Sequence, residues 1–150
     1  MNQTFSEVVI LAIAALGTGF LVFIARVVQK VMETMDELEF KRFLTTLDRY
    51  AEKSIYTIAV STVPLLAGIV YLVVFGLNHW WFVGGLAVWT GASVASKLLN
   101  LPIYKWIEDE KNTNVTQIRR KRQDLRKANN IRAALNVIAV VLMTLQFFSL

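Results

Sequence analysis

The chain contains no cysteine, a single histidine and only two prolines among its 150 residues. Metal sites in proteins usually combine several Cys, His or carboxylate ligands, which a lone histidine without cysteine cannot supply. We therefore predict that the protein holds no metal and no other cofactor. His79 lies in a short predicted turn, where we interpret it as an exposed turn residue.

Charged residues are also scarce, at 18% of the chain against about 25% in a typical soluble domain. They are almost absent from four stretches that approach the roughly 20 residues a helix needs to cross a bilayer. The predicted spans cover residues 8–25, 55–77, 80–101 and 133–150. The sequence therefore predicts an all-α fold, an integral membrane four-helix up-down bundle that forms one transmembrane domain over residues 1–150. The connections, residues 26–54 and 102–132, would be helical cytoplasmic extensions.

No basic residue precedes the first hydrophobic stretch. A signal peptide carries basic residues before its apolar run and a small-residue cleavage site after it. Here the flanks are reversed, because the residues before the run contain only Glu7 as a charge and Arg26 follows the run. We therefore predict that residues 8–25 form a retained membrane helix.

Lys and Arg are missing from the N-terminal tail, from the turn at residues 78–79 and from the C-terminus. All 16 lie between residues 26 and 53 or between residues 97 and 132. Short loops rich in Lys and Arg stay in the cytoplasm. The sequence therefore predicts that both connections are cytoplasmic and both termini are outside, in a bacterial inner membrane.

Each connection suggests its own partner. Residues 39–53 place Phe40, Phe43, Leu44 and Leu47 at helical spacing, which predicts an amphipathic helix that lies on the membrane or on the bundle. The second connection contains Arg-Arg-Lys-Arg at residues 119–122. It has no aromatic interleaving and no recognisable module, which argues against nucleic acid. Anionic lipid heads at the cytoplasmic face are its expected partner.

Three polar stripes follow from helical periodicity. A break at residues 112–114 precedes a helix that restarts near Val115. The stripes comprise Ile118, Leu125, Asn129, Arg132 and Asn136 on the last helix, Ser93, Lys97, Asn100 and Tyr104 on the third, and Arg26, Gln29 and Glu33 on the first. We predict that they meet in a polar cluster at the cytoplasmic end of the bundle. Such a cluster is either a functional site or a set of hydrogen bonds that joins the helices.

An arginine at membrane depth needs partners and room. We expect Asn100 and Arg132 to approach each other inside the bundle, directly or through water or a ligand. Glu33 is the expected acid that neutralises part of the charge of Arg132. A cavity with apolar walls and polar groups from Asn100, Asn129 and Arg132 should lie between the helices at this level.

Small residues predict close contacts between helices. They form two groups, Gly17-Thr18-Gly19 on the first span, and Gly84-Gly85 with Gly91-Ala92-Ser93 on the third. A glycine lets two backbones approach more closely than any other residue does. We therefore expect these positions to be points of contact in the bundle.

Two short motifs resemble those of the anthrone-oxygenase-like family of small four-span membrane proteins. That family ends its third span with Asn-x-Pro-x-Asn, which Asn100-Leu101-Pro102-Ile103-Tyr104 matches except that Tyr104 replaces the last Asn. It enters its fourth span through Arg-Trp followed by Asn or His and then Arg. Asn129-Asn130-Ile131-Arg132 matches the second half of this element, whereas Asp124-Leu125 stands in place of Arg-Trp.

The resemblance implies oxidation of an aromatic or polyketide-like hydrophobic substrate by molecular oxygen, without metal or flavin. Arg132 and the amides of Asn100 and Asn129 could stabilise an oxyanion, and Lys97 or Tyr104 could transfer protons. These five residues are the candidate ligand-binding set, with the catalytic residue left unknown. A non-catalytic carrier of a quinone, polyketide or lipid and a structural membrane subunit are the alternatives.

Overall fold

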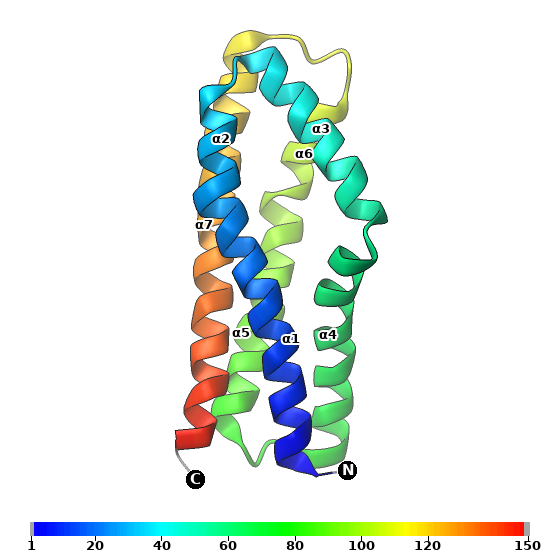
Figure 1. The fold of residues 1–150 in the computed structure, drawn as a ribbon, viewed down its shortest axis with the longest axis vertical. Coiled ribbons are helices and arrows are strands. Elements are labelled where there is room, and N and C mark those ends of the chain that lie inside the picture. The colour runs from blue at the N-terminus through cyan, green and yellow to red at the C-terminus, as the bar shows by residue number, and fades with distance from the viewer. Residues whose placement is uncertain (1, 149–150) are drawn as a thin grey trace.

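The computed structural model describes residues 2–148 and forms a bundle of four long helical segments (Figure 1). The first segment comprises α1 (Gln3–Phe23), a π-helical turn η1 (Ile24–Val28) and α2 (Gln29–Thr34). The others are α4 (Ile55–Phe75), α5 (Trp80–Leu99) continued by α6 (Leu101–Glu108), and α7 (Val115–Leu145) with the short 3-10 turn η2 (Gln146–Phe148). The connecting helix is α3 (Glu37–Lys53). No strand occurs among the described residues, so the predicted all-α fold is confirmed.

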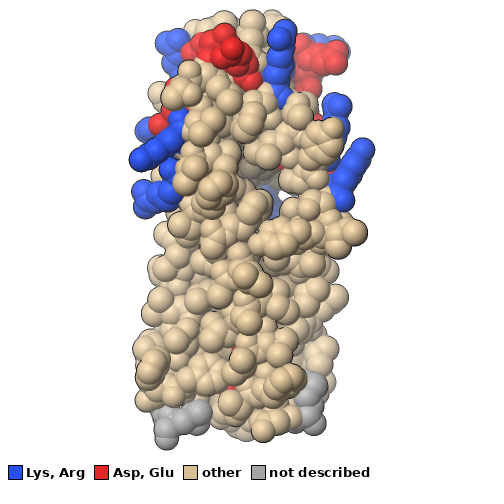
Figure 2. Space-filling view, viewed as in Figure 1, with Lys and Arg blue, Asp and Glu red and all other residues tan. Residues whose placement is uncertain are grey.

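The two ends of the bundle differ in character. Both ends of the described chain and the turn between α4 and α5 lie at one end, which we name the terminal end (Figure 1). The opposite end holds α2, α3, α6 and the start of α7, and almost all charged side chains visible in Figure 2 gather there. We name it the charged end. The last two residues of the predicted fourth span lie outside the described residues.

Four helical segments are long and apolar enough to cross a membrane, by length and composition. They run over Gln3–Thr34, Ile55–Phe75, Trp80–Glu108 and Val115–Phe148. Three of them extend beyond the hydrophobic stretches that the sequence marks, because the helix continues into the charged connections. The bundle is therefore compatible with an integral membrane protein that carries helical extensions at one end.

Polar side chains set where the helices begin. Asp36 forms a capping box at α3, in which its side chain accepts hydrogen bonds from the backbone of Leu38 and Glu39, and Glu39 accepts from the Asp36 backbone. Asn114 caps α7 by accepting from the Gln117 backbone at 3.2 Å. The predicted break and restart at Val115 are confirmed.

Helix α3 packs on the bundle, against α6 and α7. Phe40 and Leu44 are buried in one cluster with Ile103, Ile107 and Ile118, whereas Leu47 stays exposed. Of the two predicted positions for this amphipathic helix, the bundle is therefore the one observed. An ion pair between Arg119 and Glu37, at 2.8 Å, also ties α3 to α7, and its hydrogen bond holds the pKa of Glu37 below the ordinary value.

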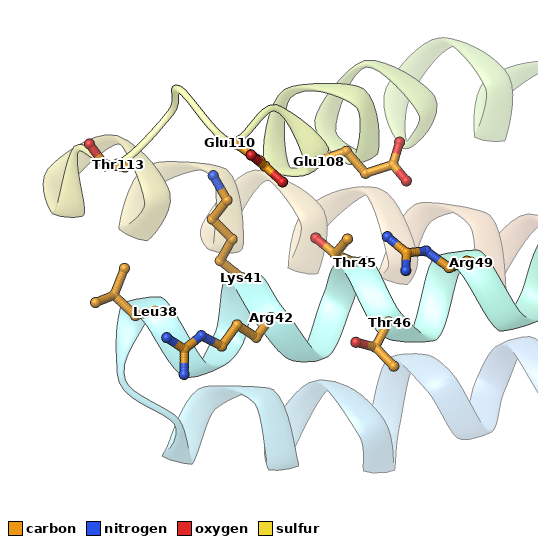
Figure 3. Close-up of a pocket in the computed structure, with 9 residues that line it drawn as sticks. All are labelled: Leu38, Lys41, Arg42, Thr45, Thr46, Arg49, Glu108, Glu110 and Thr113. Carbon is orange, nitrogen blue, oxygen red and sulfur yellow. The ribbon is translucent and has the colours of Figure 1, made fainter.

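An open groove of about 630 Å³ lies between α3 and the connection from α6 to α7 (Figure 3). Its lining comprises Leu38, Lys41, Arg42, Thr45, Thr46, Arg49, Glu108, Glu110 and Thr113. Lys41 donates hydrogen bonds to the carbonyl oxygens of Asp109 and Asn112, at 2.7 and 2.8 Å. Because Lys41 is held in this way and most of the lining is exposed, the groove is a surface seam between these elements.

Helices α5 and α7 form the closest contact in the bundle. A β-carbon added to Gly85 would lie 2.7 Å from the carbonyl oxygen of Ala139 and 2.5 Å from a side-chain carbon of Met143. Gly17 lies against Val60 of α4 at an ordinary contact distance. The predicted close contacts are therefore confirmed at Gly85 and Gly17. They are wrong at Gly19, Gly84 and Gly91, where an added β-carbon would meet no atom of another helix within 4 Å.

The π-helical turn η1 changes the face that the first helical segment presents. Gln29 is buried at 2% exposure, whereas Arg26 and Glu33 are both exposed. The predicted stripe of these three residues is therefore wrong. A π turn contains one residue more than an α turn, so it shifts the helical phase that regular spacing assumes. Beyond η1 the inward face is formed by Gln29 and Met32.

Candidate functional site

Asn129 of α7 is the centre of a buried polar network at the charged end. Its Oδ1 accepts a hydrogen bond from Asn100 Nδ2 at 2.8 Å, and its Nδ2 donates to Gln29 Oε1 at 3.3 Å. All three amides are 2% exposed. The network therefore joins α7 to α2 and to the junction of α5 and α6, where Asn100 lies between the two helices.

Arg132 binds to the same network. One guanidinium nitrogen donates to Asn129 Oδ1 at 3.4 Å, and the other donates to Ser96 Oγ at 3.1 Å. Asn100 and Arg132 thus approach each other as predicted, with the Asn129 side chain as the link between them. The Tyr104 hydroxyl lies near both and interacts with their side chains.

The predicted acid partner of Arg132 is wrong. Glu33 pairs with Arg126 of α7 at 3.4 Å, and none of the ion pairs among residues 2–148 includes Arg132. Arg126 precedes Arg132 by six residues, which is about 9 Å along the helix. Glu33 lies at the exposed charged end and reaches only the nearer arginine. Nε of Arg132 is buried and has no hydrogen-bond partner among the described residues.

A cavity of about 480 Å³ lies between the helices at this level, and we name it the bundle cavity. Its walls come from α1, α3, α4, α5, α6 and α7. Apolar lining residues include Phe20, Leu21, Val60, Leu65 and Trp89. Figure 2 shows that the surface is hollowed just below the charged band, with a Lys or Arg side chain visible inside the opening.

Four of the five candidate residues line this cavity, namely Lys97, Tyr104, Asn129 and Arg132. Lys97 is an exposed side chain, so it reaches only the edge of the cavity. Asn100 does not line it, but it donates a hydrogen bond to Asn129, which does. The predicted cavity is therefore present, but Asn100 contributes to it only through its hydrogen bond to Asn129.

The acidic residues of the cavity were not among the predicted site residues. Asp48 and Glu52 of α3 line it, together with Thr57 and Ser61 of α4. Burial raises the pKa of Asp48 above its ordinary value, and the neighbouring carboxylates of Glu52 and Glu108 raise it further. The signal was present in the sequence: Asp48 follows Leu44 by four residues, so it lies on the buried face of the amphipathic helix.

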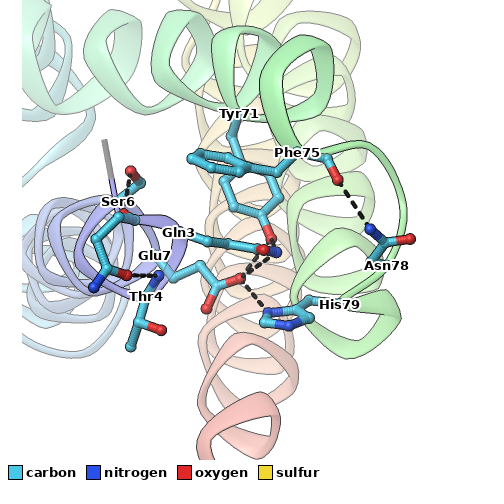
Figure 4. A network of polar contacts seen from close by, with 9 residues as sticks. Gln3, Thr4, Ser6, Glu7, Tyr71, Phe75, Asn78 and His79 are labelled. Atoms are coloured by element: carbon cyan, nitrogen blue, oxygen red, sulfur yellow. Dashed lines mark hydrogen bonds and ion pairs between the residues drawn. The ribbon is translucent and has the colours of Figure 1, made fainter.

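A second polar cluster lies at the terminal end (Figure 4). Glu7 is fully buried, its Oε1 accepts a hydrogen bond from the Tyr71 hydroxyl at 2.5 Å, and His79 Nδ1 lies 2.6 Å from the same oxygen. Gln3 donates to the Tyr71 hydroxyl at 3.0 Å. The interpretation of His79 as an exposed turn residue is wrong, because its side chain is 22% exposed and faces Glu7. A lone carboxylate beside a hydrophobic run was the signal for this cluster.

No known protein family, no curated protein and no solved structure matches this chain. Among the described residues, no three His, Asp or Glu side chains form a group that could hold a metal ion. The lining of the bundle cavity combines the guanidinium of Arg132, the phenol of Tyr104 and the amide of Asn129 with the carboxylates of Asp48 and Glu52, several hydroxyls and many apolar side chains.

Proposed function

We propose that the protein binds a hydrophobic small molecule in the bundle cavity, through an acidic or anionic oxygen that Arg132 receives. The observation that carries this proposal is Arg132 itself, a guanidinium in the cavity wall that forms no ion pair with any carboxylate of residues 2–148. A cation at membrane depth costs about 2.5–3.5 kcal/mol on insertion scales when it lies at the centre of a span. An anionic ligand oxygen would offset this cost and would complete the hydrogen bonds of the guanidinium.

Replacement of Arg132 by leucine should reduce the bound ligand at least tenfold. Hydrogen bonds to charged groups contribute about 1.5–3 kcal/mol, and about 1.4 kcal/mol corresponds to a tenfold change in affinity. The measurement is mass spectrometry of small molecules that copurify with the detergent-extracted protein, wild type against Arg132→Leu. Arg126→Leu is the matched control, since Arg126 is on the same helix but does not line the cavity. Equal ligand in a folded Arg132→Leu variant would refute the proposal.

Oxygenase-type chemistry is a second candidate function. What supports it is that the residues carrying the resemblance to the anthrone-oxygenase-like family lie together: Tyr104, Asn129 and Arg132 line the cavity, and Asn100 is bonded to Asn129. In this proposal Arg132 and Asn129 stabilise the enolate or phenolate of an aromatic or polyketide-like substrate while oxygen reacts in the apolar space. Substrate-dependent oxygen uptake that survives chelation would support it. Bound ligand without turnover would favour a carrier of a quinone, polyketide or lipid, and tolerance of apolar replacements would favour a structural subunit.

We further propose that the protein resides in a bacterial inner membrane with the charged end in the cytoplasm and both termini outside. The distribution of Lys and Arg supports this orientation, because all 16 lie in or beside the two connections. Anionic lipid heads of the cytoplasmic leaflet would then face the basic start of α7, where Arg120 is exposed.

A reporter that works only outside the cytoplasm should be active when it is fused after Leu150. The same reporter inserted at residues 110–112, in the connection between α6 and α7, is the matched control and should give the opposite result. Paired fusions of alkaline phosphatase and green fluorescent protein in a bacterial host measure both states. Cytoplasmic fluorescence from the C-terminal fusion would contradict the proposed orientation.

A further inference from the structure

The bundle cavity carries charges of both signs on different elements. Arg132 of α7 and Lys97 of α5 contribute the basic groups, and Asp48 and Glu52 of α3 contribute the acidic groups. None of the ion pairs among the described residues joins one of these bases to one of these acids. The lining therefore holds acids from α3, which we call the acidic side, and bases from α5 and α7, which we call the basic side, with no ion pair between them among the described residues.

The basic residues that line the cavity, Lys97 and Arg132, both come from helices other than α3, which contributes the acidic side. Carboxylates crowd one another there, since Asp48 experiences repulsion from both Glu52 and Glu108. A purely anionic ligand would be attracted by Arg132 and repelled by this side. A ligand with an anionic group and an ammonium group would match both sides, which is the arrangement that electrostatic complementarity favours.

The cavity also lies at the level where charged residues border the apolar parts of the spans, which is the level of a lipid headgroup in a bilayer that these spans cross. Lys53, just before the second span, and Lys97, near the end of α5, are the charges that border the apolar parts of these two spans at the charged end. The polar lining lies at this boundary, whereas Phe20, Val60 and Trp89 extend the cavity into the apolar part of the bundle. A polar head at the boundary and a hydrocarbon body toward the interior is the orientation of a membrane lipid.

The size of the cavity adds a constraint. At about 30 Å³ for each water molecule, the volume of about 480 Å³ corresponds to roughly 16 waters. That space holds a small headgroup and the first part of its chains. The remaining hydrocarbon must leave the bundle through the opening in the surface that Figure 2 shows.

Resting on the proposed function, we propose that the ligand is a zwitterionic amphiphile of the phosphatidylethanolamine type. Its phosphate binds to Arg132 and Lys97, and its ammonium group binds to Asp48 and Glu52. The phospholipid occupies the cavity from the side, with its chains in the bilayer. Among lipids of equal chain length, the ammonium group is then the feature that the protein selects.

The test compares phosphatidylethanolamine with phosphatidylglycerol of identical chains, added to the full-length, delipidated protein in detergent. Native mass spectrometry counts bound lipid, and the thermal unfolding midpoint reports stabilisation. The wild type should bind phosphatidylethanolamine about tenfold more tightly. The double variant Asp48→Asn with Glu52→Gln should lose this preference and retain phosphatidylglycerol, whereas Glu110→Gln, an acid outside the cavity, should keep it. Phosphoethanolamine without chains should not compete, which separates a lipid from a free headgroup.

Two results would overturn the inference. One is equal affinity for the two lipids in the wild type, and the other is an unchanged preference in the folded double variant. Neither result touches the proposed function, which fails separately if Arg132→Leu, folded, keeps every ligand that the wild type binds. Two results together would support the assignment. Arg132→Leu should lose both lipids, and the acid variant should lose only the preference for the ammonium group.

Discussion

Replacement of Asn129 by leucine should lower the free energy of unfolding by about 3 kcal/mol. The variant leaves the amide of Asn100 without its acceptor and the Gln29 oxygen without its donor, while both remain buried. Each buried polar group that loses its partner costs about 1–3 kcal/mol. Leucine is close to asparagine in size, so the loss reports the hydrogen bonds rather than a void. Unfolding in a titrated denaturing detergent, followed by circular dichroism, measures the difference.

Asn130→Leu is the control for this prediction. Asn130 is the next residue on α7 and is exposed, so the same chemical change there should alter stability by less than about 0.5 kcal/mol. Equal stability of the Asn129 and Asn130 variants would show that the network at the charged end contributes little to folding. The amides would then be retained for the ligand alone.

The second large effect is expected at Gly85, where alanine should destabilise the bundle by about 2 kcal/mol. The added carbon would lie 2.7 Å from the Ala139 carbonyl oxygen and 2.9 Å from the Met143 backbone nitrogen. Side chains can rotate away from such a contact, but these atoms belong to the backbone, so α5 and α7 must separate. Overpacking of this kind costs about 1–3 kcal/mol. The same unfolding titration measures it.

Gly84→Ala provides the matched comparison. Gly84 is on the same helix, and an added carbon there meets nothing within 4 Å. Because alanine is the better helix former by roughly 0.5–1 kcal/mol, this variant should be as stable as the wild type or slightly more stable. A Gly85 variant of wild-type stability would mean that the two helices move apart without cost.

Periodicity predicted α7 well because that helix is regular over its whole length. Ile118, Leu125, Asn129 and Asn136 are all buried on one face, as their spacing requires. The same rule failed on the first segment, where the π-helical turn η1 separates Arg26 from Gln29 in phase. Hydrophobic pattern alone does not mark such a turn, so the outward position of Arg26 could not be derived from spacing.

Contacts between distant parts of the chain were the other limit. Glu7, Tyr71 and His79 come from the first helix, the second span and the turn that follows it, and each has an innocuous explanation when considered alone. The pairing of Glu33 with Arg126 rather than Arg132 depends on how far α2 extends along α7. Neither the cluster around Glu7 nor the pairing of Glu33 can be derived from the order of residues along the chain. The existence of a polar cavity was predictable because several inward-facing polar stripes share one depth.

The apolar core between the two polar clusters determines in which directions a bound molecule can travel. Ile10, Phe82, Leu86 and Met143 are at most 5% exposed and fill the bundle between the cavity and the terminal end. These packed side chains therefore close the cavity toward the terminal end. Passage from the cavity to the terminal end would require this core to come apart, so a ligand of the proposed kind would enter and leave at the charged end only.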